Sequence, residues 1–305
     1  MPMPPNTNLG TESSRISASR DRLARRPAPF IWLESARRMA ERLPLLRLQP
    51  QVVLDVGCAW GDGLRLLRTQ YARANIVGVE PSHQLAAVAR GAHASQRWLR
   101  ALRGQGSTTV IAAPLDAGAN AQTGLPAAQM LWSNLALPWA ADLDTLIAAW
   151  HGALSVDGVL MFTTFGPDTL RELRQPEVKR LGIAPPAYPD MHDLGDMLLH
   201  HGFAEPVMDM EMLHLRYPSP QAALAELAEL GRPAHQALTV GLRTPRKWRA
   251  LCDVLSQRAQ SGATAAIELS FELIYGHAFK PATRPAQSGV AHFSVEQLRA
   301  SGRKR

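Results

Sequence analysis

The sequence is poor in the features that mark membrane and secreted proteins. Its 305 residues include only two cysteines, Cys58 and Cys252, without a pairing pattern. We therefore expect reduced thiols and a cytoplasmic location. No apolar run reaches the about 18–20 residues that cross a bilayer, and the first residues lack the apolar stretch of a secretory signal. The sequence thus predicts a protein without membrane attachment.

Several catalytic and nucleotide-binding motifs are also missing. The glycines do not follow the G-x-G-x-x-G spacing of nicotinamide-binding folds, and there is no phosphate-binding G-x-x-x-x-G-K-[ST] or hydrolase G-x-S-x-G run. The ten histidines form no His-x-x-x-His or His/Cys cluster, so we expect no metal site. These absences argue against nicotinamide dehydrogenases, P-loop enzymes, α/β hydrolases and zinc enzymes.

Acidic charge is scarce only at the two ends of the chain. The formal net charge is +7, of which residues 1–26 contribute +3 and residues 299–305 contribute +4. The region between them is close to neutral, so we expect no basic face for nucleic acid. We interpret residues 1–29 as a disordered basic arm and residues 282–305 as a flexible basic tail.

Between these ends, apolar runs alternate with amphipathic segments. The runs predict buried strands at residues 52–57, 75–82, 107–114, 129–137 and 157–166. Helices are expected between them, and residues 167–182 also look helical. Farther on, residues 205–220 hold one or two strands, and residues 266–279 alternate as a final strand. This order predicts an α/β fold: a Rossmann-like, doubly wound, mostly parallel sheet.

A glycine turn after the first strand is the strongest local signal of a ligand site. Asp55-x-Gly57-Cys58-x-x-Gly61 follows the strand and opens a helix, and Glu80 ends the second strand. Glycine lets the backbone approach a ligand closely, and an acid at the second strand can accept both hydroxyls of a ribose. Together they predict a nucleoside-containing cofactor without a diphosphate. The alternative is a plain tight turn with a solvated Glu80.

Longer stretches carry a family resemblance. LDVGC and VGVEPS resemble the first two motifs of class I S-adenosylmethionine-dependent methyltransferases. More specific likeness to the malonyl-[acyl-carrier protein] O-methyltransferase family of biotin synthesis lies in residues 41–57, LWSNLALPW (131–139), FTTFGPDTLRELR (162–174), residues 190–211 and YGHAFKP (275–281). The resemblance covers about residues 30–281. It implies a seven-stranded class I domain there, with helical lid segments near 170–190 and 219–262.

The resemblance also implies S-adenosylmethionine as cofactor, a malonyl-bearing acyl carrier protein as partner, and a set of binding residues. The cofactor residues it implies are Asp55, Gly57, Cys58, Ala59, Gly61, Glu80, Pro81, Asp116, Asn134 and Leu135. Ala59 stands where the family has glycine. An alanine at this position is tolerated if its φ is negative and strained if its φ is positive. Gln129 replaces an aspartate before the fourth strand, and ARRPAPF (24–30) replaces a Phe-Asp…Tyr-Asp pattern.

Transfer of a methyl group to a carboxylate that is already ionised at neutral pH needs alignment and dehydration rather than a general base. The site then needs a cation for the carboxylate, and Arg171 and Arg174 are the candidates, with Asn134 beside cofactor or substrate. TPRKWRAL (244–251) is either a basic patch for an acidic carrier protein or a solvated helix face. Two alternatives stay open: methylation of another carboxylate or a protein, and a non-catalytic assembly factor.

Overall fold

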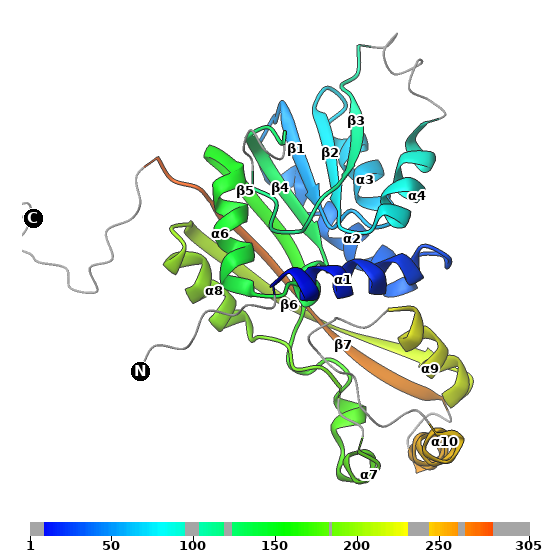
Figure 1. Ribbon diagram of the computed structural model, residues 1–305. Helices are drawn as coiled ribbons and strands as arrows, with labels where there is room; N and C mark the ends of the chain where they lie inside the picture. Colours follow the sequence, from blue (N-terminus) through cyan, green and yellow to red (C-terminus); the bar gives the residue numbers. More distant parts are fainter. Residues whose placement is uncertain are drawn as a thin grey trace, which may run out of the picture.

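The computed structural model describes residues 9–94, 104–118, 124–182, 185–230, 244–261 and 266–282. Its centre is one seven-stranded sheet (Figure 1). In spatial order the strands are β3 (Thr108–Ala112), β2 (Asn75–Glu80), β1 (Val52–Val56), β4 (Ala128–Asn134), β5 (Leu154–Phe165), β7 (Ile267–Phe279) and β6 (Ala204–Tyr217). β1 to β5 are parallel, whereas β7 is antiparallel to both of its neighbours. The predicted doubly wound, mostly parallel sheet is confirmed.

Helices cover both faces of this sheet, so β1 and β4 are buried along almost their whole length, including the polar Ser133 and Asn134. On one face lie α2 (Phe30–Ala40), α3 (Asp62–Gln70) and α4 (His83–Ala94); on the other lie α6 (Leu143–Ala153) and α8 (Met191–His200). Within the described residues, three short 3₁₀ turns connect elements: η1 (Leu43–Leu45), η2 (Leu137–Trp139) and η3 (Arg171–Arg174). No helix within the described ranges has both the length and the apolarity to cross a membrane.

The prediction of a disordered arm over residues 1–29 is wrong for residues 9–23, which form helix α1 (Leu9–Leu23). Ile16 and Leu23 of this helix are buried in the core, and so is Arg20. The local sequence is polar and looks like a solvated arm, and the helix is stabilised by contacts with distant segments. Residues 1–8 and 283–305, which include nearly all of the predicted tail, lie outside the described residues.

The second half of the chain extends the sheet on one side (Figure 1). The long antiparallel pair of β6 and β7 carries α9 (Pro220–Glu229) and α10 (Pro245–Ser261), and α10 also contacts α7 (Pro176–Arg180). The helix expected over 167–182 is broken, because Leu170 has a left-handed φ of +58° and leaves only η3 and α7. The division into a domain at 30–281 with lids near 170–190 and 219–262 stays a prediction.

Candidate functional site

The strand order reverses between β1 and β4, and ligands of doubly wound sheets bind at the carboxyl ends of the strands at such a point. Here the loop after β1 packs against the loop after β4. Gly57 has a φ of +79°, and a Cβ on it would lie 2.6 Å from the Cβ of Ala136. Only glycine therefore fits at residue 57, and the loop stays close to the sheet edge.

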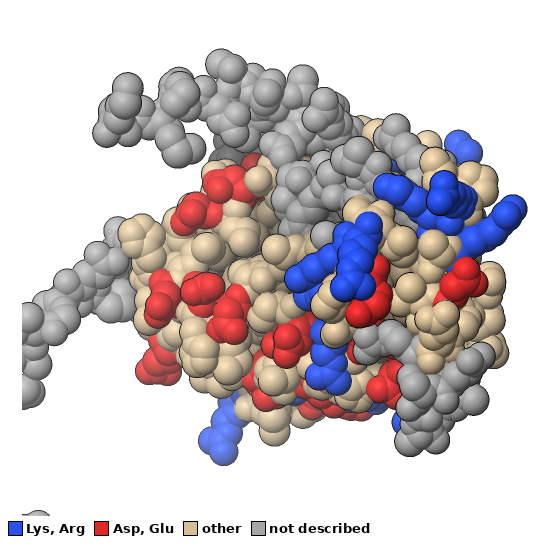
Figure 2. Space-filling view, turned by 90° about the horizontal axis from the view of Figure 1, so that it is seen from below, with Lys and Arg blue, Asp and Glu red and all other residues tan. Residues whose placement is uncertain are grey.

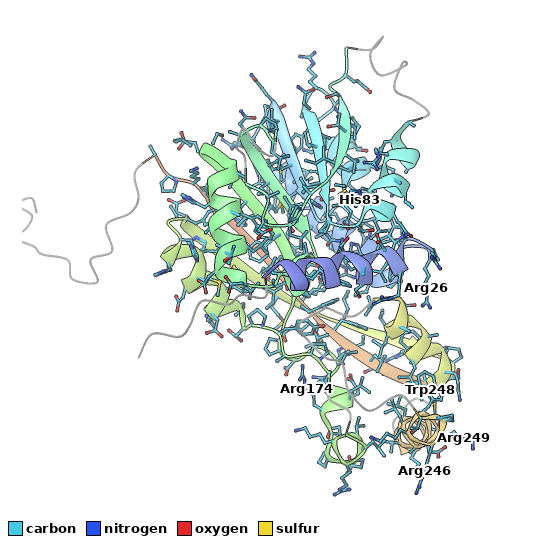
Figure 3. All side chains as sticks on the ribbon, in the orientation of Figure 1. Arg26, His83, Arg174, Arg246, Trp248 and Arg249 are labelled. Carbon is cyan, nitrogen blue, oxygen red and sulfur yellow. The ribbon has the colours of Figure 1, made fainter. Side chains whose placement is uncertain are left out.

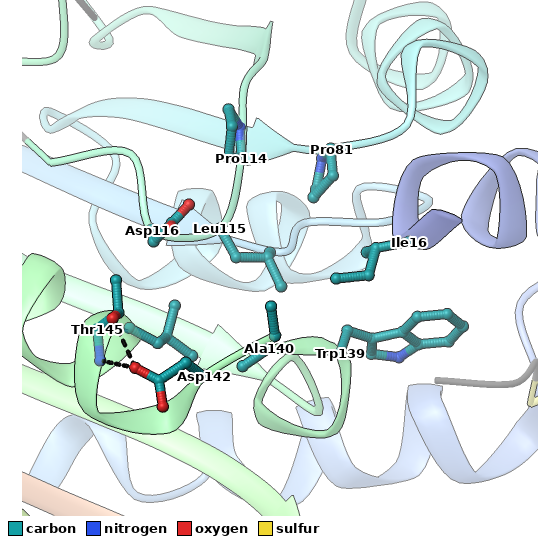
Figure 4. Close-up of a pocket in the computed structure, with 11 residues that line it drawn as sticks. Ile16, Pro81, Pro114, Leu115, Asp116, Trp139, Ala140, Asp142 and Thr145 are labelled. Atoms are coloured by element: carbon teal, nitrogen blue, oxygen red, sulfur yellow. Dashed lines mark hydrogen bonds between the residues drawn. The ribbon is translucent and has the colours of Figure 1, made fainter. Parts of the chain in front are cut away.

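Two cavities flank the Gly57 loop. The outer cavity, of about 130 Å³, is lined by Ile16, Pro81, Leu115, Asp116 and Trp139 among others (Figure 4). The inner cavity, of about 10 Å³, is lined by Trp32, Ala36, Asp55, Gly57, Cys58, Trp60, Asp62, Gly63 and Asn134. The structure thus brings most of the sequence-predicted cofactor residues to one edge of the sheet, around two separate spaces.

Glu80 lies at the end of β2 and is completely buried. Its Oε1 accepts hydrogen bonds from Arg20 Nε at 2.7 Å and from the Ser82 amide at 3.0 Å. Its Oε2 accepts from Arg20 Nη2 at 2.6 Å and from the Ala59 amide at 3.0 Å. The alternative of a solvated Glu80 is therefore wrong. Four donors fill the acceptor capacity of the carboxylate, two of them from α1.

Asp55 lines the inner cavity and, like Glu80, is buried. Its Oδ2 has no hydrogen-bond partner within the described residues. Burial, with the nearby Glu80 charge in second place, raises the pKa of Asp55. A Cβ at Gly63 would lie 2.5 Å from this Oδ2, so the first turn of α3 also requires glycine here. Burial likewise raises the pKa of the Cys58 thiol, which behaves as a small apolar group.

In the Ala59-Trp60 pair, Ala59 has the strained, positive-φ backbone conformation. Ala59 has a φ of +47°, in the left-handed region that glycine enters freely. Trp60 is buried, its indole N–H donates to the Arg26 carbonyl at 2.9 Å, and its ring meets Trp32 edge-on at 5.6 Å. Gly61, with a φ of +90°, then opens α3. Trp60 therefore forms part of the wall of the inner cavity.

Asn134 ends β4 and links three segments. Its Oδ1 accepts hydrogen bonds from Ser35 at 2.8 Å and Thr163 at 2.7 Å, and its Nδ2 donates to the Trp32 carbonyl at 3.0 Å. One N–H of the amide is left for another acceptor. The next residue, Leu135, has a φ of +50°, so strained backbone occurs on both facing loops, as is frequent at functional sites.

The two candidate arginines lie away from both cavities. The Arg171 side chain is half-exposed and 3.6 Å from Glu172. Arg174 donates from Nη2 to the Pro186 carbonyl at 2.7 Å and to the Thr169 carbonyl at 3.3 Å. Figure 3 shows it on the segment that leads toward α7. Arg174 is nevertheless close enough to Tyr188 to counter the rise that burial causes in the pKa of that phenol.

A third cavity, of about 360 Å³, adjoins the outer cavity, with which it shares Ala140, Ala141 and Asp142. It is lined by Leu137, Pro138, Ala140, Ala141, Asp142, Leu143, Asp144, Thr164, Tyr188, Pro189 and Met197. The hydroxyl of Thr164, at the end of β5, is buried without a partner among the described residues. The Thr164 hydroxyl therefore offers a donor in a cavity that is partly open to solvent, which suits a small polar substrate group.

Sequence reasoning missed Ile16, Arg20, Trp32 and Trp139. Trp139 lies in the run LWSNLALPW (131–139), which the sequence analysis used only as evidence of family resemblance. For α1, the spacing of Ile16, Arg20 and Leu23 was the one available signal, since it places three buried side chains on one helical face. Nothing in that spacing says that the arginine is paired with an acid 60 residues away.

No protein-family model matches the chain. It is 37% identical over 285 residues to the malonyl-[acyl-carrier protein] O-methyltransferase of Laribacter hongkongensis, covering 90% of this chain and 92% of that one. It is 36% identical over 266 residues to the protein of that name in Gallionella capsiferriformans, covering 85% and 87%. In fold it is similar to cyclopropane synthase MmaA2 of Mycobacterium tuberculosis (TM-score 0.50, 17% identity, 87% and 98% covered). The chain therefore belongs to the malonyl-[acyl-carrier protein] O-methyltransferase family.

Proposed function

We propose that the protein transfers a methyl group from S-adenosylmethionine to the free carboxylate of a malonyl group on an acyl carrier protein, a step of biotin synthesis in the cytoplasm. The 37% identity to the Laribacter hongkongensis protein, over 90% of the chain, carries this proposal. The two free, buried cysteines are compatible with a reducing compartment.

The residues at the strand ends fit the two halves of S-adenosylmethionine. The outer cavity offers apolar walls for adenine, with Asp116 as an acceptor for its amino group. The inner cavity offers Asp55 and the backbone of the Gly57 loop to the amino-acid part. Glycine at residues 57 and 63 lets the loop after β4 and the Asp55 carboxylate approach this loop closely, because a Cβ at either position would collide with Ala136 or Asp55. When bound, the cofactor supplies an electrophilic methyl group on a sulfonium.

The chain itself has to position the carboxylate and keep water out. A malonyl carboxylate is ionised at pH 7, so no general base is needed. We place the carboxylate in the third cavity, where the Thr164 hydroxyl is a free donor and Arg174 lies behind Tyr188. A carboxylate bound here would be aligned for in-line attack, and displacement of water by the bound substrate would strengthen these polar contacts.

A basic surface lies on α7 and α10. It consists of Lys179, Arg180, Arg246, Lys247 and Arg249, which form no ion pair with another described residue. Figure 2 looks onto this end of the molecule and shows basic groups gathered over it. α7 and α10 contact each other. An acidic carrier protein would be attracted here, close to the segment that holds Arg174 (Figure 3).

The decisive experiment measures methyl transfer to malonyl-carrier protein and to malonyl-coenzyme A, with restoration of growth in a biotin-requiring methyltransferase mutant as the test in the cell. We expect methyl ester on the carrier protein and restored growth. Arg249→Glu should raise the KM for the carrier protein about tenfold, and leave malonyl-coenzyme A unchanged. Arg73→Glu, an exposed change of the same charge at the far end of β2, is the matched control.

Methylation of another carboxylate or of a protein, with no product on malonyl thioesters, would overturn the assigned substrate. An equal effect of Arg249→Glu and Arg73→Glu on the carrier-protein reaction would overturn the docking surface alone.

A further inference from the structure

Arg20 holds Glu80 in a form that leaves no room for a ribose. The guanidinium and the carboxylate are both fully buried and joined by two parallel hydrogen bonds of 2.7 and 2.6 Å. The other two donors to Glu80 are backbone amides, of Ala59 and Ser82, which the strand-to-helix loops fix in place. Of the four donors, only those of Arg20 can leave without unfolding a loop.

The same guanidinium lies near one wall residue of each cavity. It lies 5.8 Å from the ring of Trp32, which lines the inner cavity, and 5.0 Å from the ring of Trp139, which lines the outer one. The inner cavity measures only about 10 Å³, the space of about one water molecule. A ligand that spans both cavities has to pass through the position that Arg20 occupies.

We propose that α1 is a lid over the cofactor site, latched by Arg20, and that the ribose of the cofactor displaces Arg20 from Glu80 when it binds. A ribose diol donates two O–H groups to one carboxylate, as the guanidinium fork donates two N–H groups. The two therefore compete for the same acceptors. This inference rests on the proposed function, because it takes a nucleoside cofactor as the competitor.

The contacts of α1 suit a lid that opens. Arg20 Nη1 is buried without a partner among the described residues. A buried ion pair also loses much of its attraction to the cost of removing both charges from water. The other contacts of α1 are both polar and apolar: Ser17 donates to the Pro81 carbonyl at 3.0 Å, Asp21 accepts from Ser82 and Gln84, and Ile16, Ser19 and Leu23 are buried.

Hydrogen exchange of the full-length wild-type protein, with and without saturating S-adenosylhomocysteine, tests the lid directly. We expect amides of residues 9–23 to exchange at least about tenfold faster with the ligand, while those of α6 do not. Unchanged or slower exchange in residues 9–23, at a concentration where calorimetry shows saturation, would overturn the lid.

Calorimetric titration tests the latch. Arg20→Ala and Arg20→Lys, which keeps the charge but loses the fork, should bind S-adenosylhomocysteine about tenfold more tightly than wild type, equivalent to about 1.4 kcal/mol. Arg22→Ala, an exposed change on the same helix, should bind like wild type. Binding by both Arg20 variants that equals or falls below that of wild type would overturn the latch and leave the proposed function standing. No binding by any protein at millimolar ligand would overturn the proposed function, and the latch with it.

Discussion

At the scale of single residues, the backbone of Ala59 carries a measurable cost. Its φ of +47° costs an L-residue about 1–2 kcal/mol, and glycine would avoid that cost. Glycine loses about 0.4–1 kcal/mol more on folding through chain entropy. We therefore expect Ala59→Gly to raise the free energy of unfolding by about 0.5–1 kcal/mol in urea titrations.

The matched control is Ala140→Gly in the outer cavity, where φ is −68°. At Ala140 there is no backbone strain for glycine to relieve, so the change should lower the free energy of unfolding by about 0.5–1 kcal/mol. Effects of the same sign at both positions would contradict the assignment of strain to Ala59.

Asp55 makes stability depend on pH in the opposite sense to a salt-bridged acid. Burial raises its pKa in the folded state, so its favourable contribution is full below about pH 4 and is lost as the pH rises through the folded pKa. Asparagine does not ionise, so Asp55→Asn removes this pH-dependent loss of stability. The variant should therefore gain stability over wild type progressively as urea titrations are moved from pH 4 to pH 8.

Asp62→Asn is the control for this series, since the Asp62 side chain is 31% exposed and paired with Arg65. A difference between Asp55→Asn and wild type that stays constant with pH, or narrows, would contradict a buried Asp55 with a raised pKa.

At the scale of elements, α6 depends on the residue that precedes it. Asp142 caps this helix, accepting from the Thr145 amide at 2.8 Å and the Thr145 hydroxyl at 2.6 Å. These bonds lower the pKa of Asp142, so its stabilisation is present above about pH 4 and is lost as the pH falls through the folded pKa. Asp142→Ala should lower the free energy of unfolding by about 1 kcal/mol at pH 7 and by less at pH 3.

Asp142→Asn separates the cap from the charge, because asparagine still accepts the Thr145 amide. It should retain most of the stability at pH 7 and remove the dependence on pH. Thermal unfolding of the three proteins at pH 3 and 7 checks both statements, and equal losses for alanine and asparagine would refute the capping role.

The central elements were predictable because their signals are local. Strands of a parallel sheet are covered on both faces, so the apolar run at 75–82 marks β2 to within two residues. The apolar run at 129–137 extends past the end of β4 at Asn134, because the buried 3₁₀ turn η2 (Leu137–Trp139) that follows is also apolar. Asp55, Gly57 and Glu80 came together because consecutive strands end at one edge.

The remaining features depend on distant partners. The polar sequence of α1 gives little sign of a helix, and it is held by Glu80 on another element. The sign of φ at Ala59 depends on packing of the whole loop, so the sequence left it open. The position of Arg174 depends on the turn at Leu170, where φ is positive. The hydrophobic periodicity that predicts helices and strands does not predict such a turn.

At the scale of the whole molecule, the basic surface on α7 and α10 should make the reaction sensitive to salt. Opposite charges speed association at low ionic strength, and the effect falls as the Debye length shrinks from about 10 Å at 0.1 M to 3 Å at 1 M. The kcat/KM for malonyl-carrier protein should drop about tenfold or more between 50 mM and 500 mM NaCl. Malonyl-coenzyme A should show a smaller decline, and equal declines would argue against electrostatic docking.

The position of β7 between β5 and β6 also sets an order for assembly during translation. β6 emerges from the ribosome before β7, and in the described sheet its pairing is with β7 alone. Until residues 267–279 are synthesised, β5 presents an open edge and β6 has no neighbour, and unpaired strand edges invite pairing with other chains. A chain interrupted between residues 218 and 266 would therefore be an aggregation-prone fragment, and the sheet is completed only once residues 267–279 have been synthesised.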